Sequence, residues 1–495
     1  MKRPFAATVI AATMIAAALA APAYAAKDSI SLGMQLEPPN LDPTGGAAAA
    51  IREVDYLNIF EGLTRVDENL TPHPLLAESW VISPDGLTYT FKLHAGVKFH
   101  DGAAFDCSVV KFSYERAVAP DSTNAQKGYF EPIAKTDCAD PHTAVITLKR
   151  PTGRFLYAMG LSDSVMVSPA SAAGNKTNPV GTGPFRFTRW VKGDRVELTR
   201  NDSYWGKAPA LKTVVFRFIS DPTAAAAAVM AGDLDAFPNY PAPETLDQVR
   251  ADKRFTVAVG TSSGKVIMSL NNARKPFDDV RVRRALAYAI DRKALIDALG
   301  GGGTPIGSHY APGDAAYIDL SNTYPYDPAK ARALLAEAGV KPGFVMTLRL
   351  PPPAYARRGG EVVAAMLEQV GIVAKLENIE WAQWLSQVFG KDTNYDATII
   401  NHVEARDLDL YARDFYYFNY KSDVYKALYQ KFIEATDPAA QLDLSHQLQR
   451  QLATDEPAVY LIGAARTSVW SAKLRGMWVN GLIPANDMAA VSWAE

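Results

Sequence analysis

The sequence predicts an α/β protein that is divided into several domains. Helical and strand patterns alternate along the chain, with apolar residues at three- or four-residue spacing in some segments and at every second position in others. The length of 495 residues corresponds to about three domains of roughly 150 residues each. Residues 66–182 have the pattern of a small α/β module, which is therefore a candidate for insertion into a larger domain.

The first elements predicted after residue 25 are a strand and a helix. Residues 29–35 alternate apolar and polar side chains, which predicts a strand. A helix is expected over residues 47–63, because Ile51, Val54 and Leu57 follow one another at three-residue spacing.

The candidate module, residues 66–182, combines a hairpin, a helix and a further strand. Residues 70–93 have strand patterns around the turn at 83–86. A helix is expected over residues 108–118, with Asp106 as its N-cap. Alternation returns over residues 143–148, which predicts another strand.

The rest of the chain continues to alternate helices with strands. Aspartates are expected to cap two of the helices, because a carboxylate before a helix accepts hydrogen bonds from its first free N–H groups. The expected elements, in chain order, are a hairpin over residues 185–198, a helix over 223–231 ending at Gly232, a helix over 282–290 capped by Asp278 or Asp279, a helix over 328–339 capped by Asp327, and a strand over 345–350. Arg283, Arg284 and Arg292 are expected beside the apolar stripe of the third of these elements.

Residues 1–25 have the pattern of a cleavable signal peptide. Lys2 and Arg3 precede an apolar stretch over residues 5–20, and Ala23-Tyr24-Ala25 matches the small-residue cleavage pattern. The apolar stretch is shorter than the roughly 20 residues of a membrane-spanning helix. We therefore expect a protein that is secreted to the periplasm.

The charge balance argues against nucleic acid as a partner. The chain has 51 basic and 53 acidic residues, a formal net charge of −2, whereas phosphate-backbone binding needs concentrated positive charge. The two cysteines, Cys107 and Cys138, either form a disulfide or are two buried thiols, and spacing alone does not decide between these alternatives. Neither they nor the seven histidines have the spacing of a metal site, so no metal or other cofactor is expected.

One motif suggests catalysis only by its letters. Residues 260–264 match G-x-S-x-G, the turn that carries the nucleophile of serine hydrolases. That turn requires a helix directly after the serine, but residues 265–270 have the pattern of a strand. No catalytic residues are assigned, and the protein is not expected to be an enzyme.

The segment of residues 378–420 concentrates aromatic and charged side chains that suit a polar ligand. Arginine offers a fork of donors to a carboxylate, Glu or Asp can pair with an ammonium group, and indole rings supply apolar area. The alternative is a network of surface ion pairs over buried tryptophans. The residues concerned are Trp381, Trp384, Tyr395, His402, Glu404, Arg406, Asp407, Asp409 and Tyr411.

Several segments, in this order, resemble family 5 of the bacterial extracellular solute-binding proteins, and the resemblance covers nearly the whole mature chain. They are Ile59-Phe60-Glu61-Gly62-Leu63, Leu75-Leu76-Ala77-Glu78-Ser79-Trp80, Asp85-Gly86-Leu87-Thr88-Tyr89-Thr90-Phe91, Val97-Lys98-Phe99-His100-Asp101-Gly102, Gly181-Thr182-Gly183-Pro184-Phe185, Tyr204-Trp205-Gly206, Val280-Arg281-Val282-Arg283-Arg284-Ala285 and Tyr326-Asp327-Pro328. The resemblance implies a two-lobed, class II-like binding protein with a hinge. Its implied partners are a small-molecule or peptide ligand held between the lobes and an ABC permease of the inner membrane.

The resemblance also implies a division of the chain into two lobes, and two of the expected ligand contacts, Trp381 and Asn239, match contacts of the family's peptide binders. Lobe I is expected to contain residues 26–65, 183–270 and 466–495, with the module 66–182 inserted, and lobe II to contain residues 271–465. The protein is expected to be a monomer. The expected ligand contacts are Glu37, Asn239, Tyr240, Trp381, Trp384, His402, Glu404, Arg406 and Asp407.

One position departs from the family's peptide-binding pattern. Peptide binders of this family have a Gly-Trp pair and, three residues past the Trp, an Asp for the peptide amine. Here Asn401-His402 replaces the pair and Ala405 occupies the Asp position. Either Glu404 or Asp407 binds the amine, with Arg406 on a carboxylate, or the ligand is not an ordinary peptide.

The alternatives left open are therefore opines or other amino-acid conjugates, glutathione, a nickel chelate, and a periplasmic holdase or receptor built on the same scaffold.

Overall fold

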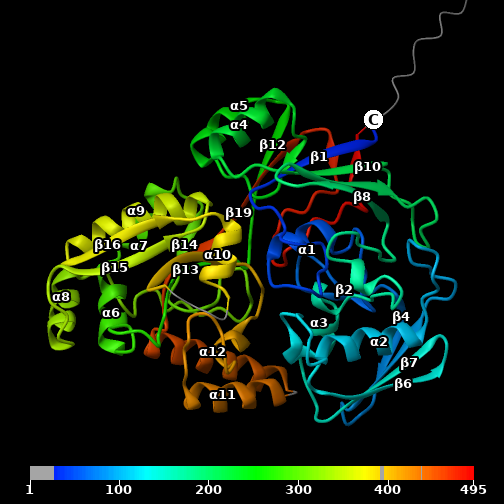
Figure 1. Cartoon of the computed structure of the whole chain (residues 1–495), viewed down its shortest axis with the longest axis horizontal. Coiled ribbons are helices and arrows are strands. Elements are labelled where there is room, and N and C mark those ends of the chain that lie inside the picture. The colour runs from blue at the N-terminus through cyan, green and yellow to red at the C-terminus, as the bar shows by residue number, and fades with distance from the viewer. Residues whose placement is uncertain (1–26, 391–394, 436, 495) are drawn as a thin grey trace, which may run out of the picture.

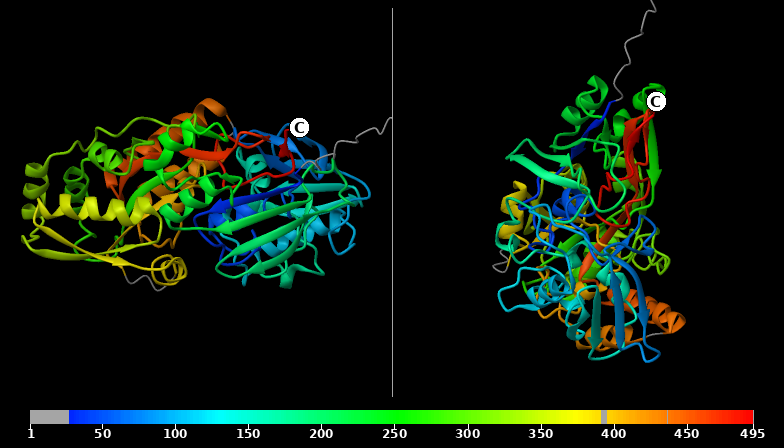
Figure 2. Two further views of the ribbon diagram at one scale, coloured as in Figure 1. Left: turned by 90° about the horizontal axis from the view of Figure 1, so that it is seen from above. Right: turned by 90° about the vertical axis from the view of Figure 1, so that its right-hand side faces the viewer.

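The computed structural model describes residues 27–390, 395–435 and 437–494. The expected signal peptide, residues 1–25, lies outside them. The described chain forms two large α/β lobes side by side, and the small module lies beneath the first lobe (Figure 1). The view from above, at the left of Figure 2, shows the same elongated, two-lobed arrangement. No helix in the described residues is long and apolar enough to span a membrane.

Lobe I is built on a seven-stranded mixed sheet. Its central strand pairs in parallel with both neighbours, and the hairpin predicted over residues 185–198 forms one edge. The strands, in spatial order, are β12 (Phe255–Gly260), β19 (Arg466–Ser471), β11 (Ala236–Phe237), β1 (Ser29–Met34), β10 (Thr213–Phe218), β9 (Arg195–Arg200) and β8 (Phe185–Val191).

Short helices accompany this sheet. They are α1 (Ala49–Asp55), α4 (Pro222–Ala231), η4 (Pro243–Thr245) and α5 (Leu246–Ala251), and the two-stranded β20 (Leu474–Arg475) and β21 (Ser492–Trp493) lie near the C-terminal end. The helix predicted over residues 223–231 is confirmed as α4. The Asp221 carboxylate accepts from the backbone N–H of Ala224 at 2.7 Å, and Gly232 ends the helix at a φ of +81°, which favours glycine.

The helix predicted over residues 47–63 is much shorter than expected. It ends at Asp55, after which Tyr56 is extended and Leu57 has a left-handed φ of +66°. The carbonyl groups that follow the helix accept hydrogen bonds from a distant segment of the chain, since Gly183 N–H donates to the Ile59 carbonyl at 2.9 Å. A Cβ on Gly183 would lie only 2.5 Å from the Asn58 carbonyl oxygen, so glycine permits this approach. Tertiary pairing therefore ends the helix.

Asp55, the last residue of α1, is a buried carboxyl without a partner. It is fully buried, and neither of its oxygens has a hydrogen-bond partner among the described residues. Burial, reinforced by the nearby Asp42, raises the pKa of Asp55 well above its ordinary value. The folded state therefore favours the protonated, neutral form.

Asp55→Asn is expected to raise the free energy of unfolding at pH 7 by about 1–3 kcal/mol. Because the folded pKa is raised, the stability linked to this proton is complete below the unfolded pKa and is lost as pH rises through the folded pKa. The gain from asparagine should therefore shrink when urea denaturation is repeated near pH 4. The exposed Asp121→Asn serves as the control, and a gain independent of pH would refute the explanation by charge.

The module contains a four-stranded antiparallel sheet with a helix across it. The sheet confirms the predicted hairpin and the strand over residues 143–148, and Asp106 caps the predicted helix by accepting from Ser108 N–H at 2.8 Å. Cys107 and Cys138, whose pairing the sequence left open, form a disulfide between helix and sheet. The elements are β2 (Thr64–Val66), β3 (Pro72–Pro74), β4 (Ala77–Ile82), β5 (Thr88–Leu93), α2 (Cys107–Val118), η1 (Lys127–Tyr129), β6 (Ile133–Asp140), β7 (Thr143–Leu148), α3 (Phe155–Met159), η2 (Ser162–Ser164) and η3 (Ala172–Gly174).

Lobe II is a six-stranded sheet between two layers of helices. Val266, Met268 and Leu270 of its central strand pack against the first layer, and Ile267 packs against the second, as the two-residue period of a strand requires. The strands, in spatial order, are β14 (Gly303–Pro305), β18 (Ala458–Ala464), β13 (Lys265–Leu270), β17 (Ala397–His402), β15 (Phe344–Leu350) and β16 (Ile372–Asn378).

The helices of lobe II confirm two predicted caps and correct one expectation. The first layer contains α6 (Val280–Ala289), α7 (Arg292–Ala298), α8 (Pro328–Glu337) and α9 (Ala354–Glu368), and the second α10 (Trp381–Gln387), η5 (Leu408–Tyr411), α11 (Asp423–Glu434) and α12 (Pro438–Asp455). Asp279 caps α6 and Asp327 caps α8. Arg283 and Arg292 are buried rather than on a charged surface, because their guanidinium groups donate to the Glu456 and Tyr460 carbonyls.

The predicted lobe boundary at residue 270 is wrong by one strand. β13 is buried along its whole length between β17 and β18, so it belongs to lobe II. The chain crosses between the lobes at residues 261–264 and at Ala465. The first crossing contains the G-x-S-x-G letters, but a strand follows it and the Ser262 hydroxyl donates to the Ala464 carbonyl. This geometry is that of a hinge connection, not of a nucleophile turn.

Candidate functional site

A cavity of about 1330 Å³ lies between the lobes and is lined by both lobes and the module. Lobe I contributes the end of β1, α1 and the chain after β11. The module contributes η1 and the start of α3, and lobe II contributes α10, the end of β17 and α11. Its lining includes ionic and aromatic side chains of all three parts, among them Arg52, Glu53, Tyr129, Arg154, Trp381, Glu404, Asp409, Arg413 and Tyr429.

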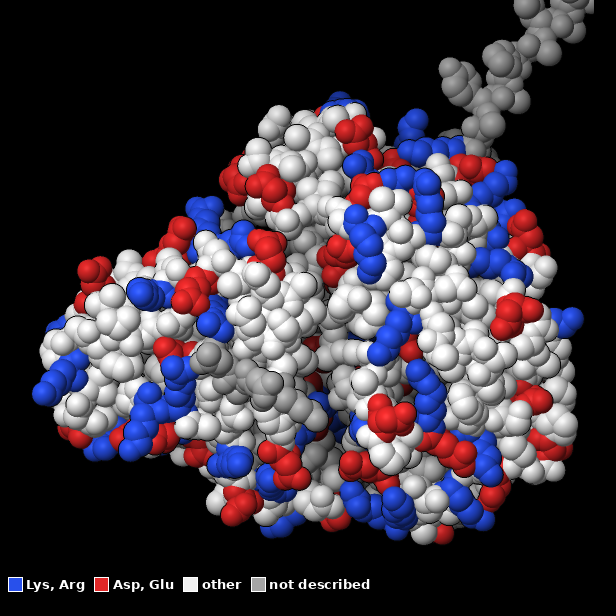
Figure 3. Space-filling view, viewed as in Figure 1, with Lys and Arg blue, Asp and Glu red and all other residues white. Residues whose placement is uncertain are grey.

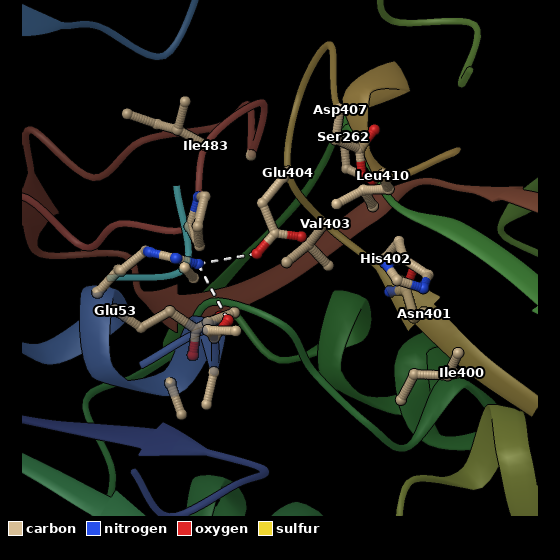
Figure 4. Close-up of a pocket in the computed structure, with 18 of the residues that line it drawn as sticks. Glu53, Ser262, Ile400, Asn401, His402, Val403, Glu404, Asp407, Leu410 and Ile483 are labelled. Carbon is tan, nitrogen blue, oxygen red and sulfur yellow. Dashed lines mark hydrogen bonds and ion pairs between the residues drawn. The ribbon is translucent and has the colours of Figure 1, made fainter. Parts of the chain in front are cut away.

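Arg52 of α1 joins the three parts of the molecule at this cavity. Its side chain is 2% exposed. One terminal nitrogen donates to Asp163 Oδ1 in the module at 2.9 Å, and the other donates to Glu404 Oε1 in lobe II at 2.8 Å. Figure 4 shows Glu404 pointing toward this guanidinium from the chain after β17. The triad of Arg52, Asp163 and Glu404 has a net charge of −1.

Asp407 and Glu404, the two carboxylates considered for a ligand amine, have different environments. Asp407 is 1% exposed and accepts from Lys265 Nζ at 2.8 Å, with His309 Nε2 3.1 Å away. Burial would raise the pKa of Asp407, but Lys265 and His309 hold it well below its ordinary value. Asp407 is therefore committed to a buried ion pair, whereas Glu404 is 24% exposed and faces the cavity.

Arg406 does not line the cavity, contrary to the expected contact with a ligand carboxylate. Its backbone has a left-handed φ of +58°. Its guanidinium lies 5.0 Å from the ring centroid of Tyr157, and its Nε is 3.7 Å from Asp314. The tight turn that brings Glu404 to the cavity thus directs Arg406 elsewhere, and Ala405 between them is buried.

The tryptophans of α10 form one aromatic wall. Trp381 and Trp384 are stacked, with ring centroids 5.1 Å apart and planes 7° apart, and both line the cavity. Trp384 donates its indole N–H to Thr398 at 2.9 Å, whereas the buried indole nitrogen of Trp381 has no partner among the described residues. Trp381 therefore offers a free donor as well as apolar area.

His402 lines the cavity but is engaged within the protein. It is buried, and its Nε2 is 2.9 Å from the Tyr417 hydroxyl. Ligand atoms of His309, His402 and Asp407 all lie within 4.8 Å of one another. However, both nitrogens of His309 contact protein groups, Asp407 and Tyr411, and the Lys265 ammonium occupies the same cluster. This arrangement disfavours a cation there.

Two of the three ligand contacts expected in lobe I line the cavity, and the third does not. Asn239 and Tyr240 line the cavity. Glu37 does not, because its carboxylate accepts from the Trp190 indole at 2.9 Å and from Gly193 N–H at 3.1 Å, which fixes the β8–β9 hairpin. These bonds give Glu37 a structural role, and the ligand contact predicted for it stays a prediction.

The lobes touch each other across the cavity at a second point. Arg413, in lobe II, donates to Gln126 of the module at 2.7 Å and to Asp409 beside it in lobe II. Together with Arg52 and Glu404, this contact places the lobes in a closed arrangement. On the face shown in Figure 3, acidic and basic side chains are interspersed.

The sequence profile of bacterial extracellular solute-binding proteins, family 5 (middle region), matches residues 71–425. The chain belongs to this family. It is thus a solute-binding protein of the ABC-importer type, and the two lobes, the hinge and the cavity between them are those of the family's fold.

Curated family 5 relatives include glutathione-binding proteins. The chain is 35% identical over 376 residues to GsiB of Pectobacterium atrosepticum, which is 74% of this chain and 72% of that protein. It is 30% identical over 449 residues to GsiB of Shigella dysenteriae, covering 85% of this chain and 86% of that one.

Solved structures of family 5 type share the whole fold. DppA of Helicobacter pylori, in complex with a peptide, has a TM-score of 0.86 at 24% identity and covers 95% of this chain and 99% of its own. AgaA of A. tumefaciens R10, in complex with agropinic acid, has a TM-score of 0.86 at 25% identity and covers 94% and 99%.

Several cavity residues of this family 5 protein were missed by sequence reasoning. Arg52 and Arg154 are single arginines without a motif, and only the folded chain brings them to the cavity. Asp409 was noted within the polar cluster of residues 378–420 but received no role. Asp409 lies only two residues after Asp407, and the sequence does not indicate which of the two carboxylates has an oxygen left for a ligand.

Proposed function

We propose that this protein captures a peptide-like or zwitterionic small solute in the cavity between its lobes and delivers it to an ABC permease. The observation that carries the proposal is that both lobes present ionic groups to one cavity between them. Glu404 suits an amine, while Trp381 offers apolar area and a free N–H donor. No chemistry on the solute is required for this function.

Hinge closure is the step that couples binding to delivery. A ligand that contacts both lobes stabilises the closed state by its differential affinity for that state. The contacts of Arg52 with Glu404 and of Arg413 with Gln126 join the lobes in the closed arrangement. A permease that recognises the closed form would then receive only loaded protein.

The ligand class is narrowed by the relatives and by the changed motif. The relatives named above bind glutathione, and AgaA was solved with agropinic acid. Ala405 stands where many peptide binders of the family have the Asp that holds the peptide amine, and Asn401-His402 replaces the Gly-Trp pair before it. These points favour glutathione or an amino-acid conjugate over an ordinary α-linked peptide. A nickel chelate is disfavoured because His402 is engaged by Tyr417.

We also propose that the protein is exported and acts in the periplasm. The leader pattern of residues 1–25 supports secretion to the periplasm through a cleavable signal peptide. There the protein would act as a monomer that shuttles to the permease in the inner membrane.

A thermal-shift screen followed by calorimetry tests the function. Mature protein with glutathione, dipeptides, tripeptides, opines and nickel–histidine is expected to show a raised melting temperature with at least one zwitterionic solute, since binding at 100 times the Kd adds about 2.7 kcal/mol of stability. Trp381→Leu should weaken that binding about tenfold or more, whereas Trp80→Leu, outside the cavity, should not. Absence of a shift with the whole panel, and of any co-purified solute, would contradict the proposal.

A further inference from the structure

Arg154, just before α3, is a cavity-lining arginine for which the described residues provide no hydrogen-bond acceptor. Its Nε and one terminal nitrogen are shielded from solvent and have no hydrogen-bond partner among the described residues. Its guanidinium carbon lies 5.6 Å from the ring centroids of Tyr157 and Phe432. By contrast, Arg52 and Arg413 each bind carboxylates of the protein. A shielded guanidinium without an acceptor is unfavourable unless an anion arrives.

Asp409, in η5, provides the opposite charge with one oxygen free. Its Oδ2 accepts from Nε of Arg413 at 3.0 Å, and from a terminal nitrogen of the same guanidinium. Its Oδ1 is shielded from solvent and has no partner among the described residues. Because Asp409 also lines the cavity, this free oxygen can accept a hydrogen bond from a ligand ammonium group.

Arg154 and Asp409 are close to the same two aromatic rings. Tyr129 of η1 and Tyr429 of α11 both line this end of the cavity. Burial raises the pKa of both phenols, the Asp409 carboxylate adds to the rise, and the Arg154 guanidinium opposes it. The Arg154 guanidinium and the unpartnered Oδ1 of Asp409 therefore lie near the same two phenols, between the module and lobe II.

The chemistry of such a pocket matches an amino-acid head, in which an ammonium and a carboxylate are attached to one carbon. In an ordinary α-linked peptide these two groups lie at opposite ends of the molecule. In a peptide joined through a side chain, such as a γ-glutamyl peptide, they remain together on the first residue. The cavity volume of about 1330 Å³ exceeds the common ligand-pocket range of about 300–1,000 Å³, which leaves room for the rest of such a molecule.

We propose that Arg154 and Asp409 form a subsite for the free α-amino-acid head of a side-chain-linked peptide of the γ-glutamyl type. Arg154 binds the head's carboxylate, Asp409 Oδ1 binds its ammonium group, and Tyr129 and Tyr429 flank it. This inference rests on the proposed function and makes it more specific, because the subsite selects γ-linked over α-linked peptides.

Isothermal titration calorimetry with two isomers tests the subsite. γ-Glutamylcysteinylglycine is expected to bind at least about 30-fold more tightly than α-glutamylcysteinylglycine. In the α-isomer the α-carboxyl group forms the peptide bond, so its α-carbon does not carry both a carboxylate for Arg154 and an ammonium group for Asp409. Arg154→Gln and Asp409→Asn should each remove most of this difference by weakening the γ-isomer. Arg154→Gln should leave the melting temperature of the unliganded protein unchanged or higher, since it deletes a charge without an acceptor.

Lys426 and Asp414 give matched controls. They line the same cavity and form a rim ion pair at 2.7 Å, in which Asp414 is 99% exposed. Lys426→Gln and Asp414→Asn change the same charges and should leave the preference between the isomers intact. Equal affinity for both isomers, or a preference that survives Arg154→Gln, would overturn the subsite while leaving the proposed function standing. Failure of every solute in the panel to bind would instead reject the proposed function.

Discussion

Asp407→Ala is expected to lower the free energy of unfolding by about 3–5 kcal/mol, because it leaves a buried lysine without its counter-charge. Lys265 and Asp407 are 2% and 1% exposed, so water cannot replace the lost carboxylate without opening lobe II. His309 also loses a partner. The measurement is chemical denaturation of the unliganded protein at pH 7, with the slope checked for two-state behaviour.

Removal of both buried charges separates the ion pair from other effects. The double variant Lys265→Met with Asp407→Leu should recover much of the lost stability, since buried pairs can be exchanged for apolar residues at small net cost. The exposed pair of Lys426 and Asp414 is the control, and Asp414→Ala should leave the free energy of unfolding close to that of the wild type. If Asp407→Ala instead left stability unchanged and only weakened solute binding, the ligand role considered from the sequence would be restored.

The parts of the fold that the sequence predicted depend on local signals. Asp106, Asp279 and Asp327 each cap the helix that follows them, because a cap needs only a side chain and N–H groups within the next three residues. The hairpin strands were found because alternation of apolar residues is also local. Family resemblance then supplied the two-lobed arrangement, which no local pattern contains.

The failures arise where distant segments decide the local structure. The helix expected over residues 47–63 ends at Asp55, because the carbonyl of Ile59 pairs with residue 183. β13 was assigned to lobe I, although it pairs along both edges with β17 and β18, which follow much later in the chain. Pairing of this kind cannot be inferred from the residues that undergo it.

The candidate site was predictable as a region but not residue by residue. The cluster of residues 378–420 does supply Trp381, Glu404 and Asp409 to the cavity. Residue type alone gave Arg406 and Asp407 the same standing as Glu404. A left-handed turn at Arg406 directs its side chain away from the cavity. Asp407 is paired with the buried Lys265 and is therefore not available to a ligand amine. Arg52, 352 positions before Glu404, had no sequence signal.

Arg52→Met is expected to have two separable effects, a loss of stability and a loss of closure. Asp163, at 4% exposed, would remain buried without its cation, which should lower the free energy of unfolding by about 3–5 kcal/mol. The lobes would also lose the contact between Arg52 and Glu404, so the unliganded protein should shift toward an open form. Denaturation measures the first effect, and small-angle X-ray scattering measures the second as an increased radius of gyration.

Glu404→Gln separates the two effects because it removes the contact between Glu404 and Arg52 but leaves Asp163 paired with Arg52. Arg52 keeps Asp163, and Glu404 itself is 24% exposed, so the stability loss should stay near about 1 kcal/mol. The shift toward the open form should nevertheless resemble that of Arg52→Met. Solute affinity should fall in both variants because less protein is in the binding-competent state, and further in Glu404→Gln, which also loses the carboxylate proposed for the solute's amine. Arg52→Met combined with Asp163→Leu should regain stability but not closure. If both single variants scattered like the wild type, the ion pair would be a consequence of closure and not a cause of it.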